Sequence, residues 1–180
     1  MDAETLVATL QAAVPGAQIE AAPSLDLQTT IYVSRDHVPA LARALREQFA
    51  FNFLSELTAV DFWPKEPRFE VVYILVSIAK RLRVRMKVRL PADDPHLTTV
   101  CDVWPAANWL EREVWDLFGI AFDGHPDPRR LLMPEDWQGF PLRKDHPVQI
   151  RMTPNASEAL QVTEEEFRSN LMKDRLTRGR

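Results

Sequence analysis

Residues 81–90 read RLRVRMKVRL, and this stretch has the cleanest periodicity in the sequence. Apolar residues at 82, 84, 86, 88 and 90 alternate without a break with arginine or lysine at 81, 83, 85, 87 and 89. Successive side chains of a β-strand point to opposite faces of the sheet. The pattern therefore predicts a strand with one face in a core and a row of positive charge on the other.

The residues before this strand predict its neighbours in a sheet. Residues 68–78 are rich in Val, Ile, Phe and Tyr and are apolar on both faces in the middle. Such a pattern is typical of a central strand, which we expect to be covered by helices on one side and by something else on the other. Ala79 and Lys80 are the expected hairpin connection, although neither is a strong turn former. Residues 53–62 predict a further strand.

The first third of the chain predicts two helices and two strands. Apolar spacing over residues 3–14 predicts a helix, and Gly16 is its expected stop. A short strand near 17–21 and an alternating strand over 27–33 follow. A second helix is expected to begin at the N-cap Asp36 and to reach about residue 50, with a proline in its first turn.

Together these elements predict an α+β fold. The expected order is helix, two strands, helix and three strands in a mixed or mostly antiparallel sheet, followed by a helix and an extended Pro-rich C-terminal arm. Residues 96–104 are ambiguous between a short strand and a helical turn. We expect residues 1–122 to form the globular domain and residues 123–180 to form an arm and tail. The pattern of Thr163 and Glu166 predicts a terminal helix over about 164–176.

Composition excludes several classes of function. The chain has 180 residues and a formal net charge of -4, which does not favour nucleic acid or anionic membrane as a partner. No apolar run approaches the roughly 20 residues of a spanning helix, so we expect membrane contact only through other proteins. Cys101 is the single cysteine, and iron-sulfur clusters typically need about four ligands. No glycine-rich phosphate loop for NAD, FMN or ATP is visible. We therefore expect no cofactor and no metal in this chain.

Residues 108–147 open as a helix and continue as a segment punctuated by proline. Gly119 stands where a helix stop is expected, because glycine tolerates the left-handed conformation. The residues after it are too rich in proline for a long helix or a central strand. They are also too apolar for a flexible linker. The segment is therefore interpreted as an ordered arm that needs a surface to lie on, and several aromatic residues of this region are expected to bury against another protein.

The same stretch contains the runs ERE at 111–113, DLFGI at 116–120, GHP at 124–126, RR at 129–130, PEDW at 134–137 and PLRKD at 141–145. In this order, these runs resemble the signature of the C subunit of bacterial NADH-quinone oxidoreductase, respiratory complex I. Pro128 departs from the family, which usually has an aliphatic residue there, and this leaves the local backbone path open. The signature and interface residues that the resemblance implies are Glu111, Arg112, Glu113, Asp116, Gly119, Gly124, His125, Pro126, Arg129, Arg130, Trp137, Gly139, Pro141, Arg143, Lys144 and Asp145.

The resemblance implies a non-catalytic scaffold subunit in the peripheral arm of the complex, on the cytoplasmic side of the bacterial inner membrane. FMN and iron-sulfur clusters are then expected in partner subunits, and the arm is expected to pack on the homologue of the D subunit. The alternative is the same role in a membrane-bound hydrogenase or a related quinone- or F420-type dehydrogenase. A freestanding enzyme that uses Glu113, Asp116 and His125 is a third hypothesis.

The charged residues allow more than one interpretation. Glu113 and Asp116 could act as paired carboxylates in acid-base chemistry, but a structural network that fixes the helix against the arm is preferred. Arg112 can pair with Asp116 four residues later. His125 with Asp127 offers too few ligands for a metal, and His37, His96 and His146 show no ligand spacing. The basic row at 81–89 is either solvated or an interface, and it lacks the interleaved aromatics of nucleic-acid modules.

Overall fold

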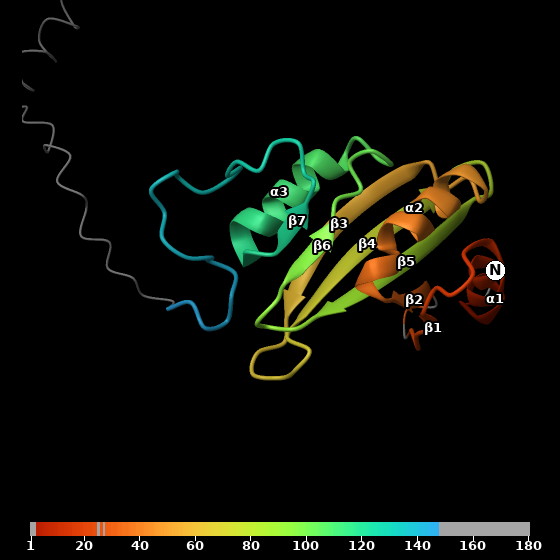
Figure 1. Cartoon of the computed structure of the whole chain (residues 1–180), viewed down its shortest axis with the longest axis horizontal. Coiled ribbons are helices and arrows are strands. Elements are labelled where there is room, and N and C mark those ends of the chain that lie inside the picture. The colour runs from red at the N-terminus through yellow and green to blue at the C-terminus, as the bar shows by residue number, and fades with distance from the viewer. Residues whose placement is uncertain (1–2, 25, 27, 148–180) are drawn as a thin grey trace, which may run out of the picture. The chain divides into compact units, whose positions relative to one another are not determined.

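The computed structural model describes residues 3–24, 26 and 28–147 (Figure 1). The described residues up to His146 form one compact unit, so the first part of the expected arm belongs to the same unit as the sheet. The predicted terminal helix over 164–176 and the end of the arm lie outside the described residues.

A five-stranded mixed sheet forms the centre of this unit. Its strands are β1 (Ile19–Ala21), β2 (Thr29–Val33), β3 (Phe53–Asp61), β4 (Phe69–Ser77) and β5 (Leu82–Leu90). They lie in the order β1-β2-β5-β4-β3, and only β2 and β5 pair in parallel. The predicted α+β class and mixed sheet are therefore confirmed.

β5 lies in the middle of the sheet and has the predicted two faces. Val84, Met86, Val88 and Leu90 are buried, whereas Arg83 and the other basic side chains are partly or fully exposed. The hairpin to β4 pairs the two strands along their whole length. The left-handed residue of its turn is Arg81 (φ 53°), which explains why the Ala79 and Lys80 dipeptide gave only a weak turn signal.

Three α-helices pack on one face of the sheet. They are α1 (Ala3–Ala13), α2 (Val38–Glu47) and α3 (Ala107–Phe118), and their apolar residues join the inward residues of β3, β4 and β5 in one core. Figure 1 shows α2 in front of the sheet in that view and α3 next to β7. The predicted N-cap Asp36 was wrong, because Asp36 lies in a short 3₁₀ helix (Arg35–His37) that precedes α2.

A second, two-stranded sheet frames α3. It pairs β6 (His96–Thr98) in parallel with β7 (Ala121–Asp123), so α3 is the crossover helix that parallel strands require. The ambiguous residues 96–104 thus begin with a strand. β7 was not predicted, because a strand of three residues directly after a helix stop leaves no periodic signal.

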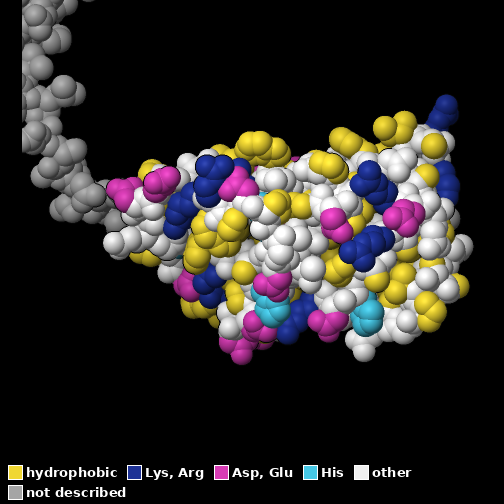
Figure 2. All heavy atoms as spheres, turned by 45° about the horizontal axis from the view of Figure 1, so that its top comes forward, with side chains coloured by type: hydrophobic (Ala, Val, Ile, Leu, Met, Phe, Trp, Pro, Cys, Tyr) yellow, Lys and Arg dark blue, Asp and Glu magenta, His cyan; other side chains and the backbone are white. Residues whose placement is uncertain are grey.

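The surface of the described residues is mixed in charge. On the face shown in Figure 2, acidic and basic side chains are interspersed, and no large region carries one sign. Among the described residues, no helix has the length and apolar character needed to cross a membrane.

Candidate functional site at the helix and arm junction

The site begins at the end of α3, where Gly119 allows the chain to turn. Gly119 has φ 71° and donates its N–H to the carbonyl of Trp115, which ends the helix in the predicted left-handed cap. A Cβ at this position would lie 2.4 Å from the ring of Phe140. Glycine is therefore required twice, for the turn and for the close approach of the arm.

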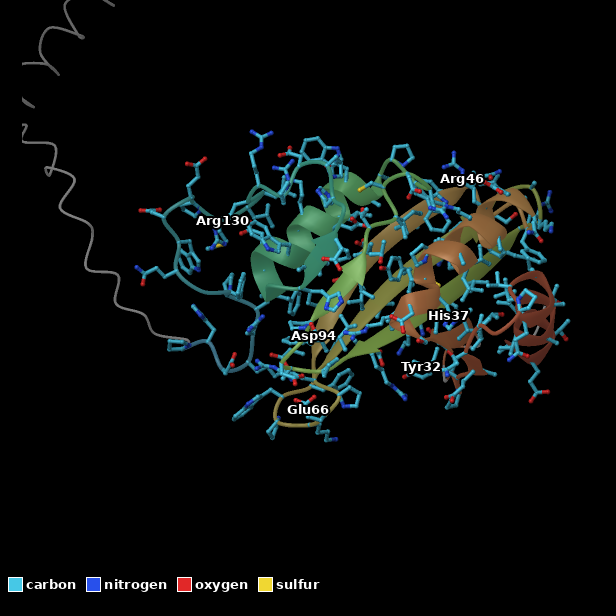
Figure 3. The ribbon with its side chains drawn as sticks, in the orientation of Figure 1. Tyr32, His37, Arg46, Glu66, Asp94 and Arg130 are labelled. Atoms are coloured by element: carbon cyan, nitrogen blue, oxygen red, sulfur yellow. The ribbon has the colours of Figure 1, made fainter. Side chains whose placement is uncertain are left out.

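Asp116 on α3 holds the middle of the arm. Its buried carboxylate accepts hydrogen bonds from the backbone N–H groups of Leu131, Leu132 and Met133 at 3.0, 2.8 and 2.9 Å. Its other oxygen accepts from Nη1 of Arg130 at 2.7 Å, and Figure 3 labels Arg130 on the arm. Burial alone would raise the pKa of Asp116, but these hydrogen bonds outweigh it and hold the pKa below its usual value.

Arg112 on the same helix holds the preceding residues of the arm. Its guanidinium donates to the backbone carbonyls of Arg129 and Arg130 at 3.0 and 3.1 Å, and lies 3.5 Å from a carboxylate oxygen of Asp127. The expected pairing of Arg112 with Asp116 is absent from the contacts of the described residues, because each side chain binds the arm instead. The two residues clamp consecutive segments of one chain.

Glu111 and His125 form the third contact between helix and arm. Glu111 is fully buried and accepts from the Val100 N–H at 2.8 Å and from the Thr99 hydroxyl at 2.5 Å. His125 uses both ring nitrogens, since Nε2 lies 3.1 Å from the Asn108 carbonyl and Nδ1 accepts from the Asp127 N–H at 3.0 Å. This pattern fits a neutral imidazole that carries its proton on Nε2. Burial raises the pKa of Glu111 above its usual value.

Cys101, Glu111 and His125 place three possible metal ligand atoms within 4.8 Å of one another. The sequence did not reveal this cluster, because its members lie far apart along the chain. A metal would have to displace the hydrogen bonds of His125, and burial raises the pKa of the Cys101 thiol to about 11. The cluster as it stands is therefore organised as a hydrogen-bonded junction.

A second anchor ties the end of the arm to the sheet. Arg68, which precedes β4, makes paired hydrogen bonds to Asp61 at 3.0 and 2.8 Å and to Asp145 of the arm at 2.9 and 2.8 Å. Asp61 also accepts from the Lys144 N–H at 2.9 Å. Burial opposes the ionised form of Asp61, but these bonds bring its pKa down to about 2. Sequence reasoning missed Asp61 and Arg68, because Asp61 lies 83 residues from Lys144 and Arg68 lies 77 residues from Asp145.

Arg143 completes the junction at the helix terminus. Its side chain donates to the carbonyls of Phe118 at 2.5 Å and of Gly119 at 3.3 Å, and its guanidinium lies over the rings of Phe69 and Phe140. It thus satisfies backbone oxygens that a helix end leaves open.

The remaining signature residues have smaller roles in the described contacts. The Trp137 carbonyl accepts a hydrogen bond from Nη2 of Arg130 at 2.9 Å. Arg129 pairs with Asp127 at the surface. Among the described residues, the Glu113 side chain has no recorded hydrogen bond or ion pair. The other predicted positions, which line turns of the arm, are Gly124, Pro126, Gly139 and Pro141.

The outer side of the junction is apolar and exposed. Trp109 on α3 and Leu132 on the arm are each 60% exposed, and Leu142 is 51% exposed. In contrast, Trp104, Phe118 and Phe122 are buried in the core of this chain. Only some of the aromatic residues of this region are therefore available to a partner.

Comparison with known protein families gives one match over most of the compact unit. Residues 31–151 match the family described as "Respiratory-chain NADH dehydrogenase, 30 Kd subunit". Proteins named as the C subunit of NADH-quinone oxidoreductase are similar in sequence. That of Geobacter sulfurreducens is 50% identical over 68% of this chain and 76% of its own length, and that of Roseiflexus sp. is 43% identical over 82% and 86%.

Two solved structures are also similar. One is described as Nqo5 of the trypsin-resistant fragment (1-134), with 36% identity and a TM-score of 0.55 over 71% of this chain and 99% of that one. The other is a chain of the membrane-bound sulfane sulfur reductase, an archaeal respiratory membrane complex. It has 30% identity and a TM-score of 0.68 over 81% of this chain and 85% of that one.

Proposed function

We propose, from the premise that this chain belongs to the family of the 30 kDa subunit of respiratory-chain NADH dehydrogenase, that it is a non-catalytic scaffold subunit of a proton-translocating NADH:quinone oxidoreductase. It sits in the peripheral arm of that complex, on the cytoplasmic side of the bacterial inner membrane. Partner subunits carry electrons from NADH through FMN and iron-sulfur clusters to quinone. This chain braces them and binds neither group.

The observation that carries the proposal is that the charged signature residues form hydrogen bonds with backbone atoms of this chain. Asp116, Arg112 and Arg143 bind backbone atoms of the arm or of the helix end. A catalytic acid or base needs to reach a substrate proton. These groups instead use their hydrogen bonds to fix one path for the arm, as expected of a scaffold.

The exposed side of the arm supports a partner at this place. The polar side of the arm is bound to α3 and to Arg68. Leu132 and Leu142 of the arm are exposed, and so is Trp109 of α3. Exposed large apolar side chains on an ordered segment are typical of interface anchors. The partner proposed for this surface is the homologue of the D subunit.

A second candidate is the same scaffold role in a related membrane complex. The similarity to a chain of the archaeal sulfane sulfur reductase complex favours it, because that chain matches 81% of this one with a TM-score of 0.68. A membrane-bound hydrogenase and a quinone- or F420-type dehydrogenase belong to this alternative. The proteins that accompany the chain distinguish them.

The experiment is affinity purification of the tagged chain from detergent-solubilised membranes, with identification of the proteins that accompany it. We expect a subunit that binds flavin and NADH together with the homologue of the D subunit, and we expect NADH:quinone activity. A hydrogenase or sulfur-reductase subunit in place of the flavin subunit would establish the second candidate. Recovery of the chain alone as a monomer would overturn both.

Limited trypsin digestion gives a second readout on the same material. We expect cleavage after Arg129, Arg130 and Lys144 to be slower in the purified complex than in the isolated chain, because the partner covers the arm. The similar Nqo5 structure is itself described as a trypsin-resistant fragment, so the protease is a suitable probe for this fold. Equal cleavage rates in the two samples would contradict the proposed place of the arm.

A further inference from the structure

The five-stranded sheet has one face that none of the described residues covers with a helix. All three α-helices pack on the core face, opposite to the basic side chains of β5. The open face also carries Val72, Ile74 and Val76 of β4, of which the last two are partly exposed. A strand that is apolar on both faces is typical of a sheet covered on both sides.

Exposed apolar side chains lie at both ends of β3 and in the turns that flank β4, whereas Glu56 and Thr58 between them on β3 are exposed and polar. Eight large hydrophobic residues are exposed in the described chain, and five of them belong to β3 or to the turns that flank β4. These five are Phe53, Val60, Phe62, Trp63 and Ile78, with exposed fractions between 38% and 76%. The loop that carries two of them, and Glu66 in Figure 3, projects beyond the end of the sheet (Figure 1).

The open face also carries the basic row of β5, which this chain neutralises only in the middle. Arg85 pairs with Asp26, and the Lys87 ammonium lies 2.7 Å from a carboxylate oxygen of Glu70. The arginines at the two ends of the row have no acidic partner among the described residues. Within the described residues Arg83 makes no ion pair, and Arg89 stacks on the ring of Tyr32 at 3.7 Å without one.

The strand register aligns each open arginine with an exposed apolar residue of β3. Phe53, Val76 and Arg83 form one cross-strand row, and Val60, Glu70 and Arg89 form another. Six residues separate the two rows along β5, which corresponds to about 20 Å at the rise of a strand. The rows run from β3 to β5 over about 10 Å, since neighbouring strands lie about 4.8 Å apart.

These dimensions fit one α-helix. A helix has a diameter of about 10 Å with its side chains, and about 13 residues span 20 Å. A helix laid along the strands would place one flank over Phe53 and Val60 and the other flank over Arg83 and Arg89.

We propose that the open sheet face docks an amphipathic helix of a neighbouring subunit, with an apolar stripe over β3 and β4 and acidic side chains toward Arg83 and Arg89. This inference rests on the proposed membership of a multi-subunit complex. Charge complementarity sets the orientation of the helix, and burial of the apolar side chains provides most of the affinity. The face is a second interface, separate from the one on the arm.

Site-specific photo-crosslinking within the intact complex tests the docking. The photoreactive residue p-benzoylphenylalanine replaces Phe53 in the full-length chain, and the complex is purified before irradiation. We expect mass spectrometry to identify one crosslinked peptide from another subunit, with acidic residues on one side of an amphipathic helix. The matched control places the same residue at Glu47, which is exposed on α2 on the covered side of the sheet, and should not crosslink to that peptide.

Charge reversal then tests the orientation. The double variant Arg83→Glu with Arg89→Glu should lower the Phe53 crosslink yield by about tenfold at low salt, because like charges across an interface repel. Lysine in place of the acidic residues of the identified peptide should restore the yield. The variant Arg46→Glu on α2 should have no effect.

Several results would overturn the proposal. They are a crosslink from Phe53 to residues 148–180 of this chain, to a second copy, to lipid or to nucleic acid, and the absence of any crosslink in an intact complex. A chain that co-purifies with no complex would instead contradict the proposed function. The set of proteins in the purified sample therefore separates the two failures.

Discussion

At the scale of single residues, Asp116 is the carboxylate on which the path of the arm depends. Replacing it by alanine would leave three backbone N–H groups and Arg130 without their acceptor. We expect the free energy of unfolding to fall by about 3–5 kcal/mol, as for other broken buried pairs. Chemical denaturation measures this change, and tryptic cleavage after Arg130 should become faster.

Glu113 is the matched control for Asp116. It lies on the same helix and is only partly buried, and its side chain has no recorded hydrogen bond among the described residues. Glu113→Ala should change the unfolding free energy by less than about 0.5 kcal/mol, as is usual at the surface. Equal losses in the two variants would show that the arm does not depend on Asp116.

Comparison of alanine substitutions at Gly119 and Gly16 separates the cost of backbone strain from the cost of a steric clash. Gly119→Ala introduces a Cβ at φ 71° and within 2.4 Å of Phe140, so both costs apply. Gly16→Ala introduces only the first cost, because Gly16 has φ 86° and nothing within 4 Å. We expect a loss of about 1–2 kcal/mol for Gly16→Ala and a further 1–3 kcal/mol for Gly119→Ala.

Thermal and urea denaturation of the two glycine variants provides the comparison. A Gly119 variant no less stable than the Gly16 variant would mean that Phe140 moves away at no cost. The arm would then be held by its polar contacts alone.

At the scale of elements, Asp61 links the β3–β4 pair to the end of the arm through Arg68 and Lys144. Its folded pKa of about 2 lies below the ordinary value of 3.8, so its stabilising effect is present above about pH 4 and is lost as pH falls through 2. The shift corresponds to roughly 2 kcal/mol at pH 7 and to about half of that at pH 3.

Urea denaturation of the wild type and of Asp61→Asn at several pH values tests this linkage. The difference in unfolding free energy should be largest near neutrality and should shrink as pH falls from 4 toward 2. Asp36→Asn is the control, because Asp36 is exposed and its carboxylate is 3.9 Å from Arg35. A difference that does not vary with pH would contradict an ionised Asp61 in the folded state.

The elements differ in how far the sequence predicts them. The strict alternation of β5 and the apolar spacing of the helices predicted those elements, because a covered face leaves a period in the sequence. β7 was missed because it has only three residues, and the start of α2 was misplaced because the 3₁₀ helix precedes it.

The candidate site was predictable only in part. Its residue types were visible, and the network between helix and arm was the preferred interpretation. The pairing was not visible, because Asp116 binds backbone amides 15 to 17 residues away and Arg68 binds Asp145 across 77 residues. Such contacts depend on tertiary packing, which local spacing does not encode.

At the scale of the whole molecule, the arm has a polar side bound to its own chain and an apolar side turned outward. Stability of the isolated chain should therefore depend on the first side, and assembly on the second. Leu132 and Leu142 belong to the second side, because they are 60% and 51% exposed. Their backbone contacts to Asp116 and to Leu117 do not involve their side chains.

The double variant Leu132→Glu with Leu142→Glu separates the two properties. In the isolated chain it should change the unfolding free energy by no more than about 0.5 kcal/mol, since both side chains are already largely in water. Recovery of the complex by affinity purification should fall sharply, because two carboxylates would be buried without partners at an apolar interface. Ala8→Glu, at an exposed position of α1, is the control and should leave recovery unchanged. Normal recovery with the double variant would place the partner elsewhere, whereas loss of folding would show that these side chains serve the chain itself.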